Sequence, residues 1–181
     1  MDTNHSFVSI AYLQSGNEIQ RRAYRAISEL GILADLAPYH PVLCGTVPIG
    51  IDVEGSDLDI VMEAYDFEGM KAEWTALYGT YDSYAMKEKT IRDVAAVKAN
   101  FQYAGFEFEL FAQPLRVHQQ HAYRHMIIEH HLLAANPHIK AEVIRLKKQG
   151  VKTEPAFAQI LGLEGDPYEA LLLLGEQLGI I

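Results

Sequence analysis

The sequence predicts an α+β fold, in which a mixed β-sheet with packed helices is followed by an α-helical C-terminal half. Two observations carry this prediction. Apolar and polar residues alternate with period two in several segments before Pro114, whereas apolar residues recur at the helical period of about 3.6 after it. Helical and strand patterns are also interspersed before Pro114, as in a sheet covered by helices. We therefore expect a core over residues 1–113 and a helical subdomain over 114–181, joined without a long linker and sharing a hydrophobic core.

The first expected element is an amphipathic helix. It follows Asn17, a residue type that caps helices, and Gly31 is a plausible stop. Its apolar face consists of Ile19, Ala23, Ile27 and Leu30.

The sheet is expected to begin with strands at 41–45 and 58–64, separated by a loop that contains proline and glycine. Asp66 then caps a helix that continues to about Tyr78.

Three antiparallel strands are expected next, and a tight turn at Ala104-Gly105 joins the last two. These strands cover residues 81–90, 93–103 and 105–112.

The remaining segments are all predicted to be helical, with proline and glycine between them. They cover residues 115–135, 137–149, 155–161 and 167–178.

Composition excludes several classes of protein. The chain has 181 residues, 49% of them hydrophobic and 22% charged, as in a single globular domain or a core with a helical annex. Its net charge of −9 disfavours binding along an extended nucleic acid. It has no apolar segment of the roughly 18–20 residues that cross a bilayer, and residues 1–5 lack a signal-peptide pattern, so we expect a cytoplasmic protein without a membrane partner. Its one cysteine, Cys44, is expected to be a buried small hydrophobe.

Two aspartates form the most informative motif. Asp57 and Asp59 stand at the head of an apolar strand, about ten residues after Gly45-Thr46. Side chains two positions apart on a strand point to the same side, so the two carboxylates repel unless a cation lies between them. Carboxylate oxygens are ligands of hard divalent ions, which predicts a Mg²⁺ or Mn²⁺ site.

A third carboxylate comes from a later strand. In residues 106–111 acidic and apolar residues alternate, which places Glu107 and Glu109 on one face.

A Gly-Ser/Thr turn, an Asp-x-Asp motif and a later strand acid in this order resemble the nucleotidyltransferase superfamily of DNA polymerase beta and the minimal nucleotidyltransferases. The chain also resembles one uncharacterised bacterial family of that type, in residues 43–62, 109–113, 122–129 and 152–168. This resemblance selects Glu109 over Glu107 as the third acid. It departs from the usual pattern at Thr46, where serine is common.

The resemblance implies a transferase that moves a nucleoside monophosphate from an NTP such as ATP to a hydroxyl of a small molecule, a protein or an RNA end. Asp57, Asp59 and Glu109 would be the catalytic and metal-binding residues. Gly45, Thr46 and Ser56 would contact the nucleotide, because glycine allows close approach of the backbone to phosphate. The alternative is a catalytically inactive nucleotide-binding or protein-interaction (antitoxin-like) module of the same fold.

The helical half is expected to add cations that offset the charge of a triphosphate. Arg124 and Lys152 are the candidates, with Tyr123 as a residue that stacks on a base. A weaker hypothesis is a zinc site, since four residues fall on one helical face at spacings of three or four. They are His118, His121, His125 and Glu129.

Overall fold

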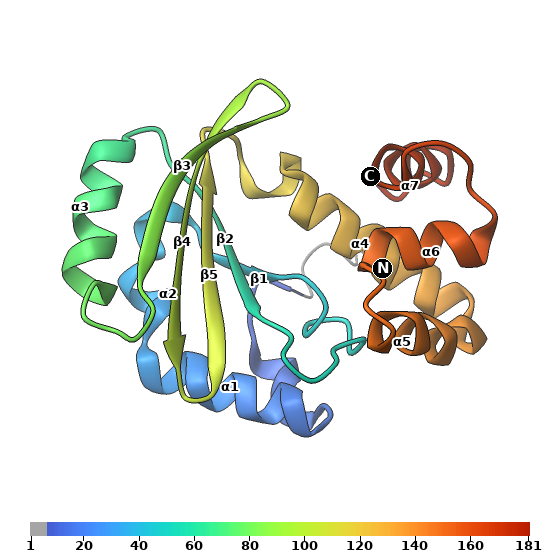
Figure 1. Cartoon of the computed structure of the whole chain (residues 1–181), viewed down its shortest axis with the longest axis horizontal. Helices are drawn as coiled ribbons and strands as arrows, with labels where there is room; N and C mark the ends of the chain where they lie inside the picture. The colour runs from blue at the N-terminus through green and yellow to red at the C-terminus, as the bar shows by residue number, and fades with distance from the viewer. Residues whose placement is uncertain (1–6) are drawn as a thin grey trace.

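The computed structural model describes residues 7–181 and shows one mixed sheet with helices packed on both faces (Figure 1). The predicted α+β fold is confirmed. Residues 1–5, on which the expectation of no signal peptide rests, lie outside the described residues. The strands are β1 Val42–Cys44, β2 Leu58–Glu63, β3 Ala85–Ile91, β4 Val94–Tyr103 and β5 Phe106–Gln113.

The strand order is β1-β2-β5-β4-β3. The β2–β5 pair is parallel and the other three pairs are antiparallel. Consequently β2 and β5, which are far apart in the sequence, lie side by side at the centre of the sheet. Side chains that alternate along β2 and β5 therefore point toward the same two layers of helices.

The first layer contains α1 (Glu18–Leu30), α2 (Ile32–Asp35) and α3 (Phe67–Tyr78). Asn17 caps α1 as predicted: its side chain accepts from the Gln20 backbone N at 2.8 Å, while Gln20 Oε1 accepts from the Asn17 backbone N. Gly31 ends the helix in the left-handed conformation at φ 75°. Apolar residues of α1 and α3 form the first core with β2, β4 and β5.

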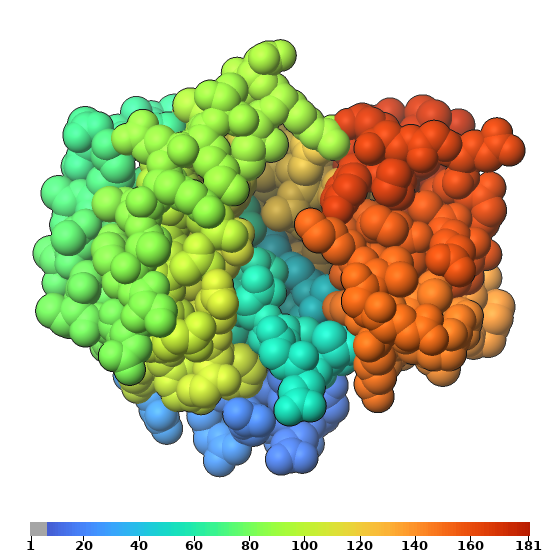
Figure 2. All heavy atoms as spheres, in the orientation of Figure 1, coloured from blue at the N-terminus to red at the C-terminus, as the bar shows by residue number. Residues whose placement is uncertain are grey.

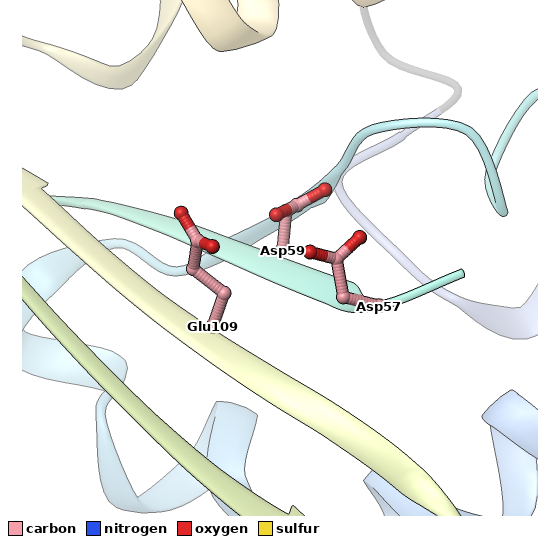
Figure 3. A group of neighbouring side chains, drawn as sticks. All are labelled: Asp57, Asp59 and Glu109. Carbon is pink, nitrogen blue, oxygen red and sulfur yellow. The ribbon is translucent and has the colours of Figure 1, made fainter. Parts of the chain in front are cut away.

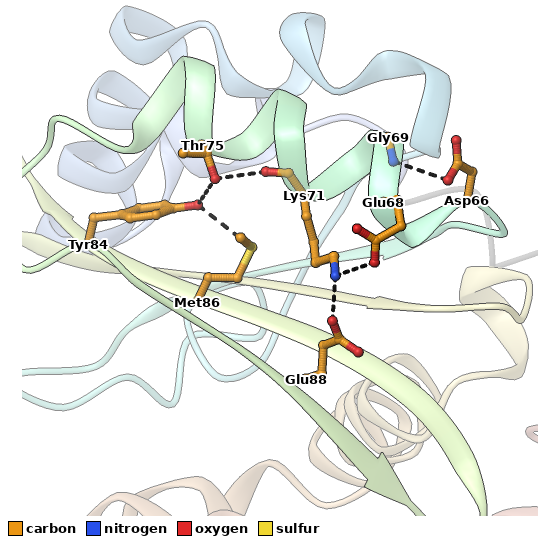
Figure 4. Close-up of polar contacts among 8 residues, drawn as sticks. All are labelled: Asp66, Glu68, Gly69, Lys71, Thr75, Tyr84, Met86 and Glu88. Atoms are coloured by element: carbon orange, nitrogen blue, oxygen red, sulfur yellow. Dashed lines mark hydrogen bonds and ion pairs between the residues drawn. The ribbon is translucent and has the colours of Figure 1, made fainter.

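Contacts with α3 also hold the outer strand β3 (Figure 4). Asp66 caps α3 by accepting from the Gly69 backbone N at 3.1 Å, and Lys71 pairs with both Glu68 and Glu88. The strand begins at Ala85, four residues later than predicted. Residues 81–84 form turns instead, because the Tyr81 ring packs on aromatic residues of β4.

Both hairpins of the β3–β4–β5 meander have two-residue turns, Arg92-Asp93 and the predicted Ala104-Gly105, with positive φ at every position. The first hairpin reaches across to the helical half, where Arg92 pairs with Glu169 (Figures 1 and 2).

The helical half consists of α4 (His121–Ala135), α5 (Lys140–Lys148), α6 (Thr153–Leu161) and α7 (Pro167–Gln177). Asp166 caps α7. The predicted helix over 115–135 is shorter than expected. Residues 117–119 form a 3₁₀ turn, and the Gln120 amide donates to the Met62 carbonyl at 2.7 Å and the Leu115 carbonyl at 2.9 Å. Short 3₁₀ helices also occur at Ala11–Ser15, Ala37–Tyr39 and Pro137–Ile139.

A second hydrophobic core joins the two halves. Cys44, Ile51 and Val61 from the sheet half are buried among apolar residues of α4, α5, α6 and α7. Cys44 is a free, buried thiol, as predicted, and burial raises its pKa well above the usual value. The division at residue 113 remains a prediction, with the two parts in one packed unit. Among the described residues, no helix is both long and apolar enough to cross a membrane.

Candidate active site

Three carboxylates converge where β2 and β5 lie side by side (Figure 3). Asp59 on β2 is level with Glu109 on the parallel strand β5, and Asp57 directly precedes β2. One carboxylate oxygen from each residue lies within 4.8 Å of the others. Three oxygen ligands at this separation match the donor set of a divalent hard cation.

Gly45 allows the end of β1 to approach this cluster closely. Its φ is +80°, and a Cβ added there would lie 2.2 Å from Asp59 Oδ2. Any other residue would force the Asp59 carboxylate to move. Thr46 and Ser56 lie beside it on the same cavity, and Ser56 Oγ accepts from the Val53 backbone N at 2.9 Å, so the serine also holds its own loop.

The two aspartates of the cluster ionise less readily than an aspartate in water. Burial, followed by the negative charges of Asp57 and Glu109, raises the pKa of Asp59 well above its usual value. Burial and the Glu109 charge likewise raise the pKa of Asp57. The Lys98 ammonium, which forms an ion pair with Glu109, opposes both shifts. The cluster therefore favours binding of additional positive charge.

The carboxylates open into a cleft of about 480 Å³ between the sheet and the helical half. Figure 2 shows the surface hollowed between the strands and the orange helices α5 and α6. The sheet wall consists of Gly45, Thr46, Ser56, Asp57, Asp59, Val61, Glu109 and Phe111. The helical wall consists of Ala122, His125, Met126, Glu129, Lys147, Lys152, Thr153, Glu154 and Tyr168.

Two lysines on the helical wall face the acidic sheet wall. Lys152 is there as expected, at the start of α6. Lys147 on α5 was not singled out from the sequence, where it is one of several cations between residues 140 and 152. Burial lowers the pKa of Lys147, while nearby carboxylates, Glu129 first, oppose that shift. The cleft thus has acidic side chains on its sheet wall and lysines on its helical wall.

Polar groups of α4 are buried in the same wall. Glu129 is 3% exposed, and its Oε1 has no hydrogen-bond partner. Burial, followed by the charge of Glu154, raises its pKa well above the usual value. His125 Nε2 lies 3.0 Å from the Tyr168 carbonyl, and its Nδ1 lies 3.6 Å from Glu154 Oε1.

The expectation that Arg124 faces the cleft is wrong. Its guanidinium pairs with Glu176 at 3.0 Å, and it lines two other cavities, one shared with Tyr123. The reason is helical phase. Successive residues of a helix are rotated by about 100°, so Arg124 points away from the cleft that His125 lines.

The zinc hypothesis also lacks the required geometry. Over residues 7–181, Asp57, Asp59 and Glu109 are the one group of three or more potential ligands close enough to share an ion. The four residues of the hypothesis are divided, since His118 lines a different cavity from the one that His125 and Glu129 line.

A family model described as a domain of unknown function (DUF4269) matches residues 25–174. The chain belongs to this family. No curated protein sequence matches it significantly.

Solved structures with a similar fold include a poly(U) polymerase with RNA terminal uridylyl transferase activity. The Cid1 poly(U) polymerase bound to MgGTP superposes with a TM-score of 0.52 at 13% identity, covering 70% of this chain and 41% of Cid1. The GLD-2/RNP-8 complex gives 0.53 at 13% identity, covering 84% of this chain and 61% of the other. A second Cid1 structure, described as an RNA terminal uridylyl transferase, gives 0.51 at 12% identity. The fold is that of the nucleotidyltransferase superfamily, and this chain spans about two fifths of Cid1.

Proposed function

We propose that the protein is a divalent-metal-dependent nucleotidyltransferase that moves a nucleoside monophosphate from an NTP to a hydroxyl acceptor. The convergence of Asp57, Asp59 and Glu109 carries this proposal. Carboxylate oxygens are the ligands that Mg²⁺ and Mn²⁺ prefer. The raised pKa values of Asp57 and Asp59 mean that a bound cation would stabilise their charged forms. When bound, such an ion would withdraw charge from the phosphates and favour nucleophilic attack at phosphorus.

The chain's own residues would bind the phosphates and accept the proton of the acceptor hydroxyl. Gly45 and Thr46 would bring backbone N–H groups and a hydroxyl to the phosphates from the sheet side. Lys147 and Lys152 would offset the phosphate charge from the helical side. The acceptor oxygen would bond to the α-phosphorus as the bond to the β-phosphate oxygen breaks and pyrophosphate leaves. Glu109 would take the hydroxyl proton, because it lies on β5, which β2 separates from the phosphate-binding end of β1.

The test is pyrophosphate release from each NTP with Mg²⁺ or Mn²⁺, measured with hydroxyl acceptors that include RNA ends, proteins and small molecules. We expect release by the wild-type chain and its loss in Asp57→Asn and Asp59→Asn. Glu63→Gln is the matched control, because Glu63 is a β2 carboxylate outside this cleft. Equal release by wild type and both aspartate variants would refute the assignment. Metal-dependent NTP binding without release would favour the inactive binding module.

A further inference from the structure

One cation lies against the carboxylate cluster and was not expected from the sequence. Lys98 on β4 forms an ion pair with Glu109 Oε2, and the two side chains are 21% and 20% exposed. Lys98 is level with Phe111 on β5, while Asn100 is level with Glu109, so lysine and glutamate are diagonal neighbours on one face of the sheet. The contact is therefore fixed by strand register.

No other cation in the described structure forms an ion pair with this cluster. Lys147 and Lys152 line the opposite wall of the cleft and make no ion pair with Asp57, Asp59 or Glu109 among residues 7–181. Asn100, the residue level with Glu109, donates to Glu107 at 2.7 Å instead. Lys98 thus holds one of the three carboxylates of the cluster.

The Lys98–Glu109 ion pair changes the net charge of the carboxylate cluster. Three ionised carboxylates carry a charge of −3, and the Lys98 ammonium reduces the total to −2. One divalent ion balances this remaining charge. A second divalent ion near Glu109 would meet the ammonium at close range, and like charges at such separations repel strongly.

We propose that Lys98 is a built-in counter-ion that limits the nucleotide-free site to one divalent ion, held chiefly by Asp57 and Asp59. This inference rests on the proposed function, because it requires the carboxylates to bind a divalent ion. Lys98 acts through Glu109 and is a positioning residue. It holds the third carboxylate in place before metal and nucleotide arrive.

Mn²⁺ binding to the full-length, nucleotide-free protein tests this, with free Mn²⁺ followed by electron paramagnetic resonance. We expect wild type and Lys98→Arg to bind one ion. Lys98→Met should bind two, the first about tenfold more tightly, since a charge at this range shifts carboxylate equilibria by one or more powers of ten. Lys89→Met is the matched control: Lys89 is an exposed lysine on the neighbouring strand β3 and makes no ion pair with the cluster.

Thermal melts provide a second readout. Without metal, Lys98→Met should melt below wild type, because three carboxylates then lack their counter-ion, and Mn²⁺ should raise its melting temperature more than that of wild type. If the variant is unfolded without metal, we expect Mn²⁺ to restore its folding.

Two results would overturn the inference: two ions bound by wild type, or one ion bound by Lys98→Met with wild-type affinity. Either would leave the proposed function standing. If neither protein binds Mn²⁺, the metal site fails as well, and the proposed function fails with it.

Discussion

Replacing Gly45 by alanine should weaken both the folding stability of the protein and its binding of a divalent metal ion. A residue with a Cβ at φ +80° costs roughly 1–2 kcal/mol in the left-handed region. The new Cβ would also lie 2.2 Å from Asp59 Oδ2, far inside the contact distance of about 3.5 Å. Asp59 can turn its carboxylate away, at a further cost of about 1 kcal/mol for an unfavourable rotamer. We therefore expect Gly45→Ala to lose about 2–3 kcal/mol.

Gly55 offers a matched control. Its φ is +83°, and nothing lies within 4 Å of an added Cβ, so Gly55→Ala carries the backbone cost alone. Urea denaturation should show a loss of about 1–2 kcal/mol for Gly55→Ala. Mn²⁺ titration should show wild-type affinity for Gly55→Ala and an affinity weaker by about tenfold or more for Gly45→Ala, because displacing the surroundings of a ligand commonly costs 10–100-fold. Equal stability losses together with unchanged Mn²⁺ affinity in Gly45→Ala would refute the reasoning.

Two further predictions concern the helical wall. Lys147→Met and Lys152→Met should each weaken Mg²⁺–NTP binding by about 1.5–3 kcal/mol in calorimetry. Arg124→Ala should leave the binding unchanged, because the Arg124 side chain points away from the cleft. An equal effect of all three substitutions would show that only the net charge of the protein matters. The folded-state pKa of Glu129 lies above its usual 4.5, so the folded protein retains a proton that the unfolded chain has released, and stability should fall as pH rises above 4.5. Glutamine has no such proton to release. Between pH 5 and pH 8 the free energy of unfolding, measured by urea denaturation, should therefore fall less in Glu129→Gln than in wild type. An identical fall would exclude Glu129 as its source.

Sequence patterns were sufficient where the information is local. The cap at Asn17 and the stop at Gly31 depend on residues within one helical turn. The alternation in 106–111 placed Glu109 on a polar face, and the shared face of Asp57 and Asp59 followed from their spacing.

Features that depend on register or packing were not predictable in the same way. Period-two alternation in β4 indicates that Lys98 lies on the polar face, but only the β4–β5 register brings it to Glu109. Arg124 is one position away from His125, which lines the cleft, and so points in another direction. Capping and periodicity locate the helix in the sequence but do not fix how α4 is rotated about its axis relative to the sheet. Lys147 could not be distinguished from its neighbouring cations because the packing of α5 decides which of them turns inward.

The parallel pairing of β2 with β5 has a consequence for the order of folding. The β3–β4–β5 meander joins neighbouring segments through two-residue turns, whereas Asp59 and Glu109 come from strands separated by α3 and two further strands. Pairings between distant segments close large loops and form more slowly than local ones. We therefore expect β2 to dock against the meander late in folding, so that the repulsion between the carboxylates arises only after most of the sheet has formed.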